Sequence, residues 1–444
     1  MAKYKIILLV FLIGFILRLL LPMERVFNFD QDQIALNAMN IVKGDWTALG
    51  PQTSHMSFYT GPLIYYWAAV FYGLTGGHPL ANTLTSAAIY VFSFWLIWYF
   101  FKSLLPLKIT QLYLAIFALS PYLVQLNRIT WNPNFSFLSG SLVLAALLKP
   151  NQLSLWLGMF LAYQSNFSGF VMVAVLLLYW LFNRQQFKLI VVGFFGLLSS
   201  MLPLITFDFR HNFMNITSLG NFIYKAIFEM SFGFLPRIKN VLMINFENFT
   251  KLLSGYFYPG FVLVLLGISI LILWLIKPRS YFSSAQKKTL LLWMAVFPFA
   301  ALFYDEGLPE YYFLMQLPAL IFMLTDLLIG NKNRQLLAGL FMMIISLGVI
   351  FDNRNGYSLR EKYAAAKYIQ NQSAGRPVQI VFDMDYRERF GWDYLFQYFK
   401  IEQSSCCEQV HLIYPALPWT PVSARFGSLG VFSQNFIEYN KNTL

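Results

Sequence analysis

Residues 5–22 read KIILLVFLIGFILRLLLP, and shortly afterwards residues 29–33 read FDQDQ. A helix needs about 20 mostly apolar residues to cross the hydrocarbon core of a bilayer, so the first stretch predicts a membrane span. No small-residue cleavage site precedes Pro22, and we therefore expect an uncleaved anchor and not a removed signal peptide. The second stretch places two carboxylates just beyond the far end of that span.

Apolar runs of this kind recur along the chain. Hydrophobic residues make up 58% of the sequence and charged residues 12%, whereas a soluble domain carries about 25% charged residues. The composition excludes an ordinary soluble enzyme and a disordered chain, and it predicts an α-helical polytopic membrane protein. About eleven spans are expected, at roughly 5–22, 79–101, 109–126, 133–149, 152–165, 167–183, 188–206, 256–276, 288–304, 311–329 and 334–351.

The distribution of charge predicts the orientation of these spans. If the N-terminus lies inside, the short inner loops carry many Lys and Arg residues, while the short outer turns carry one, Arg128. This is the positive-inside pattern, and it places the C-terminus outside in a multi-pass protein of the inner or plasma membrane. Much of the net charge of +12 then reflects topology, so we expect no nucleic-acid partner. Basic residues on the outer side can meet lipid headgroups or phosphate.

The predicted spans divide the chain into two parts. Residues 1–351 form a membrane module whose long outer segments are 23–78 and 207–255, and residues 352–444 form an extracytoplasmic domain. In that domain, residues 358–361 show a capping-box pattern that opens a helix to about residue 372. Strands are expected at 378–382 and 410–414, with a helix at 385–399 between them. We predict a small α/β domain.

Two carboxylates in the first outer segment are candidates for chemistry. Asp30 and Asp32 lie just before an amphipathic helix whose apolar face contains Ile34, Ala38 and Ile41. A carboxylate there could take a proton from an acceptor hydroxyl. The alternative is a helix N-cap, a position that Asp favours. Residues two apart do not face one another on a helix, so at most one of the two points into a site.

Further polar residues of the outer turns could line a substrate site. Arg210 and His211 follow the seventh span, where a guanidinium could grip phosphate or extend to lipid headgroups. The turn with Arg128 and Asn132 is either part of a site or a helix start at Pro133. Glu310 belongs to an acidic turn that could bind a cation or hydroxyls, or be a solvated loop. We take Arg128, Asn132, Glu310 and His55 as candidate substrate-lining residues.

The sequence contains no motif for nucleotide or metal chemistry. A phosphate-binding glycine loop, a dinucleotide fingerprint and a His-Glu-x-x-His pattern are all missing. His55 and His211 do not have the spacing of metal ligands. A nucleotide-using site on the inner side is therefore unsupported, and whether a divalent metal ion takes part stays open.

Taken in order along the chain, the outer motifs resemble those of C-type glycosyltransferases, in particular the protein O-mannosyltransferase and aminoarabinose-transferase group. The resemblance covers residues 1 to about 351 and rests on the acidic stretch at 29–32, the aromatic stretch at 61–67, and the segments 131–134, 207–211 and 310–318. It implies an inverting transferase that takes a sugar from a polyprenyl-phosphate donor, bound from the membrane lipids, at the outer face. The acceptor is unknown: a lipid, a glycan or a protein.

The resemblance also implies roles for individual residues. Asp30 would be the catalytic base, with Asp32 as the second candidate, because many mannosyltransferases carry an Asp-Glu pair where this chain has Asp-Gln-Asp. Arg210 and His211 would hold the donor phosphate, and Tyr311 or Tyr312 would lie beside it.

Two other functional classes compete with the enzyme. A lipid-linked saccharide flippase or other transporter would show internal repeats, broken helices and ionisable residues in midspan, whereas the polar residues here concentrate in outer loops. A non-catalytic scaffold that presents the C-terminal domain would tolerate replacement of those polar residues.

Overall fold

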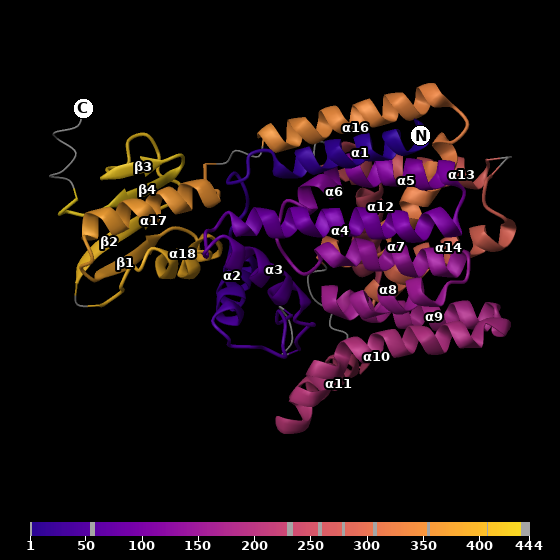
Figure 1. Cartoon of the computed structure of the whole chain (residues 1–444), viewed down its shortest axis with the longest axis horizontal. Coiled ribbons are helices and arrows are strands. Elements are labelled where there is room, and N and C mark those ends of the chain that lie inside the picture. The colour runs from indigo at the N-terminus through magenta and orange to yellow at the C-terminus, as the bar shows by residue number, and fades with distance from the viewer. Residues whose placement is uncertain are drawn as a thin grey trace.

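The computed structural model describes residues 2–53, 58–228, 234–255, 260–277, 280–304, 309–352, 356–405 and 407–436. A helical body occupies most of the molecule, and a small α/β lobe lies at one end (Figure 1). The helices of the body are α1 (Ala2–Leu19), α2 (Phe29–Val42), α3 (Leu63–Leu74), α4 (Ala81–Leu104), α5 (Leu107–Leu119), α6 (Pro121–Leu126), α7 (Asn134–Leu148), α8 (Gln152–Ser165), α9 (Val171–Phe182), α10 (Phe187–Arg210), α11 (Met214–Phe228), α12 (Phe234–Ser254), α13 (Gly260–Leu275), α14 (Ser284–Ala301), α15 (Leu317–Leu328) and α16 (Lys332–Asp352).

Every predicted apolar run overlaps at least one of these helices. By length and composition, three described helices are long and apolar enough to cross a membrane, namely α4, α10 and α16. Several shorter apolar helices accompany them. The predominantly helical fold is therefore confirmed, while the number of spans and their orientation stay predictions.

One predicted span is divided into two helices. The run 109–126 forms α5 and α6, which meet at Ser120 and Pro121. Proline lacks an N–H and its ring clashes with the carbonyl four residues earlier, so the helix restarts at Pro121. The Ser120 hydroxyl donates to the Leu252 carbonyl at 2.7 Å and fixes this break against α12.

The centre of the body is α7, all of whose residues are buried. Its small residues allow close packing of its neighbours. A Cβ atom at Gly140 would lie only 2.5 Å from the Met315 carbonyl oxygen, so glycine is needed for the approach of the segment that precedes α15. This buried helix begins directly after the turn that contains Asn132.

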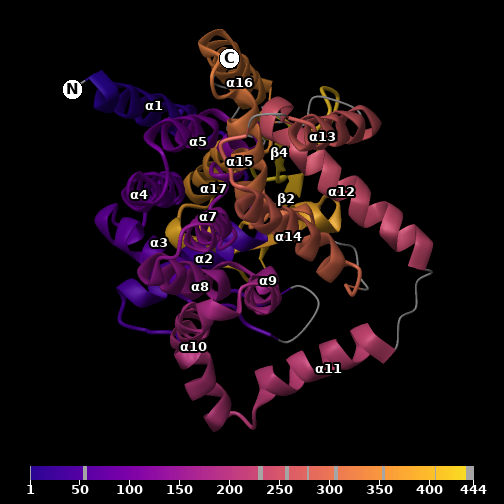
Figure 2. The same ribbon diagram turned by 90° about the vertical axis from the view of Figure 1, so that its right-hand side faces the viewer.

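The described parts of the segments 23–78 and 207–255 are mainly helical, as the amphipathic pattern after Asp32 predicts for the first of them. The first forms α2 and α3, which pack against each other next to the α/β lobe (Figure 1). The second continues α10 to Arg210 and then forms α11 and α12. Figure 2 shows α11 lying across the space between α10 and α12, at one side of the body.

The C-terminal lobe contains α17 (Leu359–Ser373), α18 (Asp393–Tyr398) and strands β1 (Val378–Asp383), β2 (Glu408–Ile413), β3 (Ala424–Phe426) and β4 (Leu429–Phe432). The sheet order is β1-β2-β4-β3. β1 and β2 are parallel, with Ile380 opposite Val410, and the other pairs are antiparallel. The capping box at Ser358 and Glu361 is confirmed.

The predicted helix at 385–399 is wrong in its first half. A short 3-10 turn occupies Tyr386–Arg389, and α18 begins only at Asp393. Gly391 between them has φ of 87°, a left-handed conformation that glycine adopts readily and that an α-helix does not contain. The β3–β4 hairpin was not predicted.

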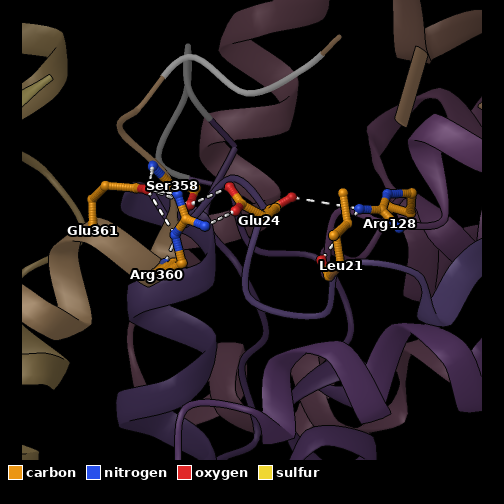
Figure 3. Close-up of polar contacts among 6 residues, drawn as sticks. All are labelled: Leu21, Glu24, Arg128, Ser358, Arg360 and Glu361. Carbon is orange, nitrogen blue, oxygen red and sulfur yellow. Dashed lines mark hydrogen bonds and ion pairs between the residues drawn. The ribbon is translucent and has the colours of Figure 1, made fainter. Parts of the chain in front are cut away.

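The lobe is bonded to the segment that follows α1 through polar groups. Glu24 forms an ion pair with Arg360 at the start of α17, and Arg360 Nη2 also lies 2.7 Å from Glu361 Oε1. The Ser358 hydroxyl donates to Glu361 at 2.5 Å and to Glu24 at 3.4 Å (Figure 3). The backbone continues this contact, because Leu359 N donates to the Arg25 carbonyl at 2.9 Å. The lobe therefore packs directly on the segment that leads into α2.

Candidate functional site

A polar cavity of about 810 Å³ lies beside α2. Helix α2 provides one wall, residues 47–53 and Tyr59 a second, and Tyr65 of α3 and Asn132 complete the lining. Its volume lies within the range of about 300–1,000 Å³ that is typical of small-molecule sites. The lining residues are Phe29, Asp30, Gln33, Ile34, Asn37, Thr47, Leu49, Gly50, Pro51, Gln52, Thr53, Tyr59, Tyr65 and Asn132.

Asp30 is the acidic residue of this lining. Its carboxylate is exposed to the cavity, and the described residues give it no hydrogen bond or ion pair. The protein around the cavity nevertheless desolvates the group, which raises the pKa of Asp30. A carboxylate with a raised pKa and unoccupied oxygen atoms is a suitable general base. The residue that precedes α2 is Asn28, whose N–H donates to Gln31 Oε1 at 3.0 Å, so Asp30 is not the N-cap.

Asp32 faces the opposite way, toward the C-terminal lobe. It is buried, and its Oδ1 accepts the backbone N–H of Tyr394 at 2.9 Å in the first turn of α18. Burial raises the pKa of Asp32 to about 7, although the Tyr394 hydrogen bond opposes the shift. The two acids thus point in different directions, as expected for neighbours two apart in a helix. Of the two candidates, Asp30 is the one that lines the cavity.

Asn132 connects the polar cavity to a group of aromatic residues. It lines the cavity, and its side-chain amide donates to the Ser165 carbonyl. The adjacent Trp131 contacts Tyr311 with ring centroids 5.0 Å apart, and Tyr311 contacts Tyr312 at 5.2 Å. The two predicted tyrosines therefore lie next to the turn that lines the Asp30 cavity.

Tyr312 belongs to a second, apolar cavity of about 390 Å³. Residues from α9 and the turn before it, α11 and α14 form its wall, together with Phe313. A basic side chain borders this cavity. Arg237 of α12 is buried and donates from Nη1 to the Leu302 carbonyl at 3.0 Å, between the lining residues Ala301 and Phe303. Arg237 was not among the residues predicted from the sequence, because it is one of several basic residues in the segment 207–255.

The structure places Arg128 at the end of α1 and not in the cavity lining. Its guanidinium is mostly buried and donates to the carbonyls of Leu17, Leu20, Leu21 and Glu24, two of which appear in Figure 3. Leu17 lies in the last turn of α1, whose final carbonyls have no intrahelical partner, and the other three residues lie in the segment that follows the helix. The observed contacts of Arg128 therefore hold the end of α1 and the chain after it.

Arg210 and His211 lie at the end of α10, and neither lines the two cavities described above. Arg210 is exposed, and His211 Nδ1 is 2.8 Å from the Phe207 carbonyl oxygen, with its ring stacked on the Phe207 ring. Their predicted contact with donor phosphate therefore has no described site around it and stays a proposal.

Asp208, in the same motif, has a defined structural position. It is buried and accepts hydrogen bonds from Asn215 N at 3.1 Å, Asn215 Nδ2 at 2.8 Å and Ile216 N at 3.0 Å. Asn215 Oδ1 in turn accepts the N–H of Tyr59 at 3.2 Å, and Tyr59 lines the polar cavity. Asp208 therefore holds the start of α11 and, through Asn215, one wall of the cavity.

We expect Asp208→Ala to lower the free energy of unfolding by about 1–3 kcal/mol, because buried donors at the start of α11 lose their acceptor. Thermal unfolding in detergent measures the loss. Asp352→Ala, a change at the exposed end of α16, is the matched control and should be nearly neutral. An equally stable Asp208→Ala protein would contradict this role.

Glu310 is paired inside the protein. Its Oε2 accepts from Lys251 Nζ at 2.5 Å, and Lys251 also lies 3.6 Å from Glu247. The Glu310 carbonyl accepts from Asn248 at 3.3 Å, so the residue joins α12 to the segment that carries Tyr311. His55, the remaining predicted lining residue, lies outside the described residues, as do Asp305 and Glu306.

No group of three or more His, Cys, Asp or Glu side chains that could hold a metal ion occurs among the described residues. The candidate site thus consists of a carboxylate in a polar cavity, an aromatic connection and an apolar cavity with a basic residue at its border.

The body, the segments 23–78 and 207–255 and the lobe together form a fold similar to that of ArnT, which agrees with the resemblance seen in the sequence. Two solved structures show it, both of ArnT from Cupriavidus metallidurans. The structure bound to undecaprenyl phosphate aligns with a TM-score of 0.57 and 11% sequence identity over 97% of this chain and 97% of that chain. The apo structure aligns with a TM-score of 0.50 and 11% identity over 98% of each chain.

Neither a family model nor a curated protein sequence matches this chain. At 11% identity, the likeness to ArnT concerns the fold. Together with the apolar helices, it indicates an integral membrane protein.

Proposed function

We propose that this protein is an inverting glycosyltransferase that moves a sugar from a polyprenyl-phosphate donor to an acceptor hydroxyl at the outer face of the membrane. The fold of ArnT, one of whose structures contains undecaprenyl phosphate, supports the class. The observation that carries the proposal is the Asp30 carboxylate, which faces a cavity of about 810 Å³ without a described partner.

In the proposed reaction, Asp30 accepts the proton of the acceptor hydroxyl while the hydroxyl oxygen attacks the anomeric carbon of the donor sugar. The bond between that carbon and the phosphate oxygen breaks, and the polyprenyl phosphate leaves with the electron pair. Attack opposite the leaving phosphate inverts the anomeric centre. A lipid phosphate is a good leaving group, so the protein needs a base for the acceptor and a cation near the departing phosphate.

The apolar cavity is where we place the polyprenyl chain of the donor. Its lining is almost entirely aromatic and aliphatic, and Tyr304 and Tyr312 contribute hydroxyl groups at one side, where their oxygens are 3.5 Å apart. The Trp131–Tyr311–Tyr312 contacts join it to the Asp30 cavity. A donor with its tail in the apolar cavity would extend its phosphate and sugar along these aromatic rings toward Asp30.

Two basic residues are candidates for binding the donor phosphate. The resemblance implies Arg210, whereas the border of the apolar cavity favours Arg237. We expect Arg237→Gln to lower kcat/KM for the donor by about tenfold or more, because it removes a cation that binds the donor phosphate and stabilises the charge that the phosphate gains as it leaves. Arg210→Gln is the comparison and should have a smaller effect. A larger effect of Arg210→Gln than of Arg237→Gln would identify Arg210 as the residue that binds the donor phosphate.

The class itself is tested with purified protein in lipid vesicles and polyprenyl-phosphate sugars labelled in the sugar. Release of the sugar to water, or its transfer to components of a membrane extract, is the expected result. Movement of the intact donor across the bilayer without release would instead support the flippase. The likeness of the fold to ArnT does not favour that alternative.

A further inference from the structure

The lining of the Asp30 cavity combines one charged group with many neutral polar groups. Four carboxamide side chains, Gln33, Asn37, Gln52 and Asn132, share it with the hydroxyl-bearing Thr47, Thr53, Tyr59 and Tyr65. Asp30 is the one carboxylate in this described lining, which contains no Lys, Arg or His. Burial raises the pKa of Tyr65, so its hydroxyl stays neutral.

The neutral groups are distributed over both walls of the cavity. Asp30, Gln33 and Asn37 follow one another at spacings of three and four residues, which places them on one face of α2. The opposite wall is fixed by backbone hydrogen bonds, since Gly50 N donates to the Thr60 carbonyl and Thr60 N to the Pro51 carbonyl, both at 3.0 Å. Tyr66 and Tyr163 add bonds from their hydroxyls to the carbonyls of Thr47 at 2.7 Å and Tyr59 at 3.1 Å.

We propose that the sugar transferred next to Asp30 is uncharged, a neutral hexose or pentose whose hydroxyls bond the carboxamide and hydroxyl groups of this cavity. This inference rests on the proposed function and specifies its donor. Amides and hydroxyls both donate and accept, so they match the hydroxyls of a sugar.

A charged substituent fits this lining poorly. A carboxylate on the sugar would meet the negative Asp30 and find no basic partner in the described lining, and a charge removed from water without a partner is costly. An ammonium group could pair with Asp30 alone. That pairing would occupy the carboxylate which the acceptor hydroxyl needs, so an amino sugar that binds this way would inhibit its own transfer.

The test compares donors that share the same polyprenyl phosphate and differ in the sugar. The panel contains mannosyl and glucosyl donors, a 4-amino-4-deoxyarabinosyl donor and a galacturonosyl donor. Two readouts are taken with the full-length protein: release of polyprenyl phosphate, and the rise of Tm on adding each donor, which reports binding without an acceptor. We expect at least one neutral donor to exceed both charged donors in kcat/KM by about tenfold or more.

A variant of the protein tests whether the charge of the cavity lining selects the donor sugar. Asn37→Asp adds a second carboxylate to the cavity wall, two helical turns from Asp30. It should shift the ratio of the two kcat/KM values by about tenfold toward the amino-sugar donor. Asn40→Asp is the matched control, because Asn40 lies on the same helix, is exposed and does not line the cavity. It should leave the ratio unchanged.

The outcomes separate the two proposals. If a charged donor is transferred as well as the neutral donors or better, the neutral-sugar inference is wrong and the glycosyltransferase proposal stands. If no donor is turned over and none raises Tm, the proposed function fails, and the donor inference fails with it. If Asn40→Asp shifts the ratio as much as Asn37→Asp, the cavity wall is not what selects the sugar.

Discussion

Asp30→Asn is expected to lower kcat for sugar transfer by about 10²- to 10⁴-fold, the range that a general base contributes. Asn has nearly the same shape as Asp but cannot accept the proton of the acceptor hydroxyl. Because Asp30 is exposed to the cavity and has no described partner, the substitution should leave the thermal stability almost unchanged. Release of labelled sugar and Tm, measured on the same preparation, test both statements.

Two control variants distinguish loss of the base from a general effect of charge. Asp32→Asn keeps an acceptor oxygen for the Tyr394 N–H and should retain most activity. Asp45→Asn removes an exposed charge outside the cavity and should be neutral. If Asp32→Asn loses transfer while Asp30→Asn keeps it, the assignment of the base is wrong and the second acid of the motif takes that role.

The pH dependence offers a second readout for Asp30. The base acts only when deprotonated, so activity falls as the pH drops through its pKa. Burial raises that pKa, and the acidic limb of kcat/KM should therefore lie above the ordinary Asp value of about 3.9. Transfer that is equally fast well below that value would exclude a carboxylate base.

Most of the helices could be predicted from the sequence, because apolar runs and capping patterns are local signals. The runs predicted α4, α10 and α16, and the Ser358–Glu361 pattern predicted the start of α17. The division at Pro121 and the break at Gly391 depend on single residues. A long apolar or amphipathic pattern predicts one continuous helix, and a single proline or glycine within it does not show that the helix breaks there.

The candidate site was predictable only in part. The acidic motif indicated α2, but it could not say which carboxylate faces the cavity, because that depends on the position of α18 more than three hundred residues later. Arg128 appeared available from its place in a predicted outer turn, whereas its side chain bonds the carbonyls of Leu20 and Glu24, just beyond α1. The position of Arg237 at the apolar cavity could not be predicted, because its contact with Leu302 joins two segments that are distant in the sequence.

The same long-range dependence makes Lys362 of α17 important for the start of α2. Its ammonium group is buried and donates to the Phe27 carbonyl at 2.8 Å, Asn28 Oδ1 at 3.2 Å and the Phe390 carbonyl at 2.8 Å. Burial lowers the pKa of Lys362 to about 7. The lobe thus holds the residues immediately before Asp30 with this lysine, and it donates the Tyr394 N–H of α18 to Asp32. These contacts fix the first turn of α2 from both sides.

We expect Lys362→Met to lower the free energy of unfolding by about 3 kcal/mol, because buried acceptors lose their donor while the volume of the side chain is nearly kept. We also expect kcat to fall by about tenfold or more, since misplacement of a catalytic group by about 1 Å can cost 10²-fold. The KM for the donor should change little, because the apolar cavity contains no residue of the lobe.

Lys367→Met on the same helix is the control, because Lys367 is exposed and its loss should affect neither stability nor kcat. Assays below the Tm of each variant separate a misplaced base from an unfolded protein. If Lys362→Met is less stable but transfers sugar at the normal rate, α2 holds Asp30 without the lobe. If kcat falls with KM unchanged, the C-terminal lobe is part of the catalytic unit, because it then sets the position of Asp30.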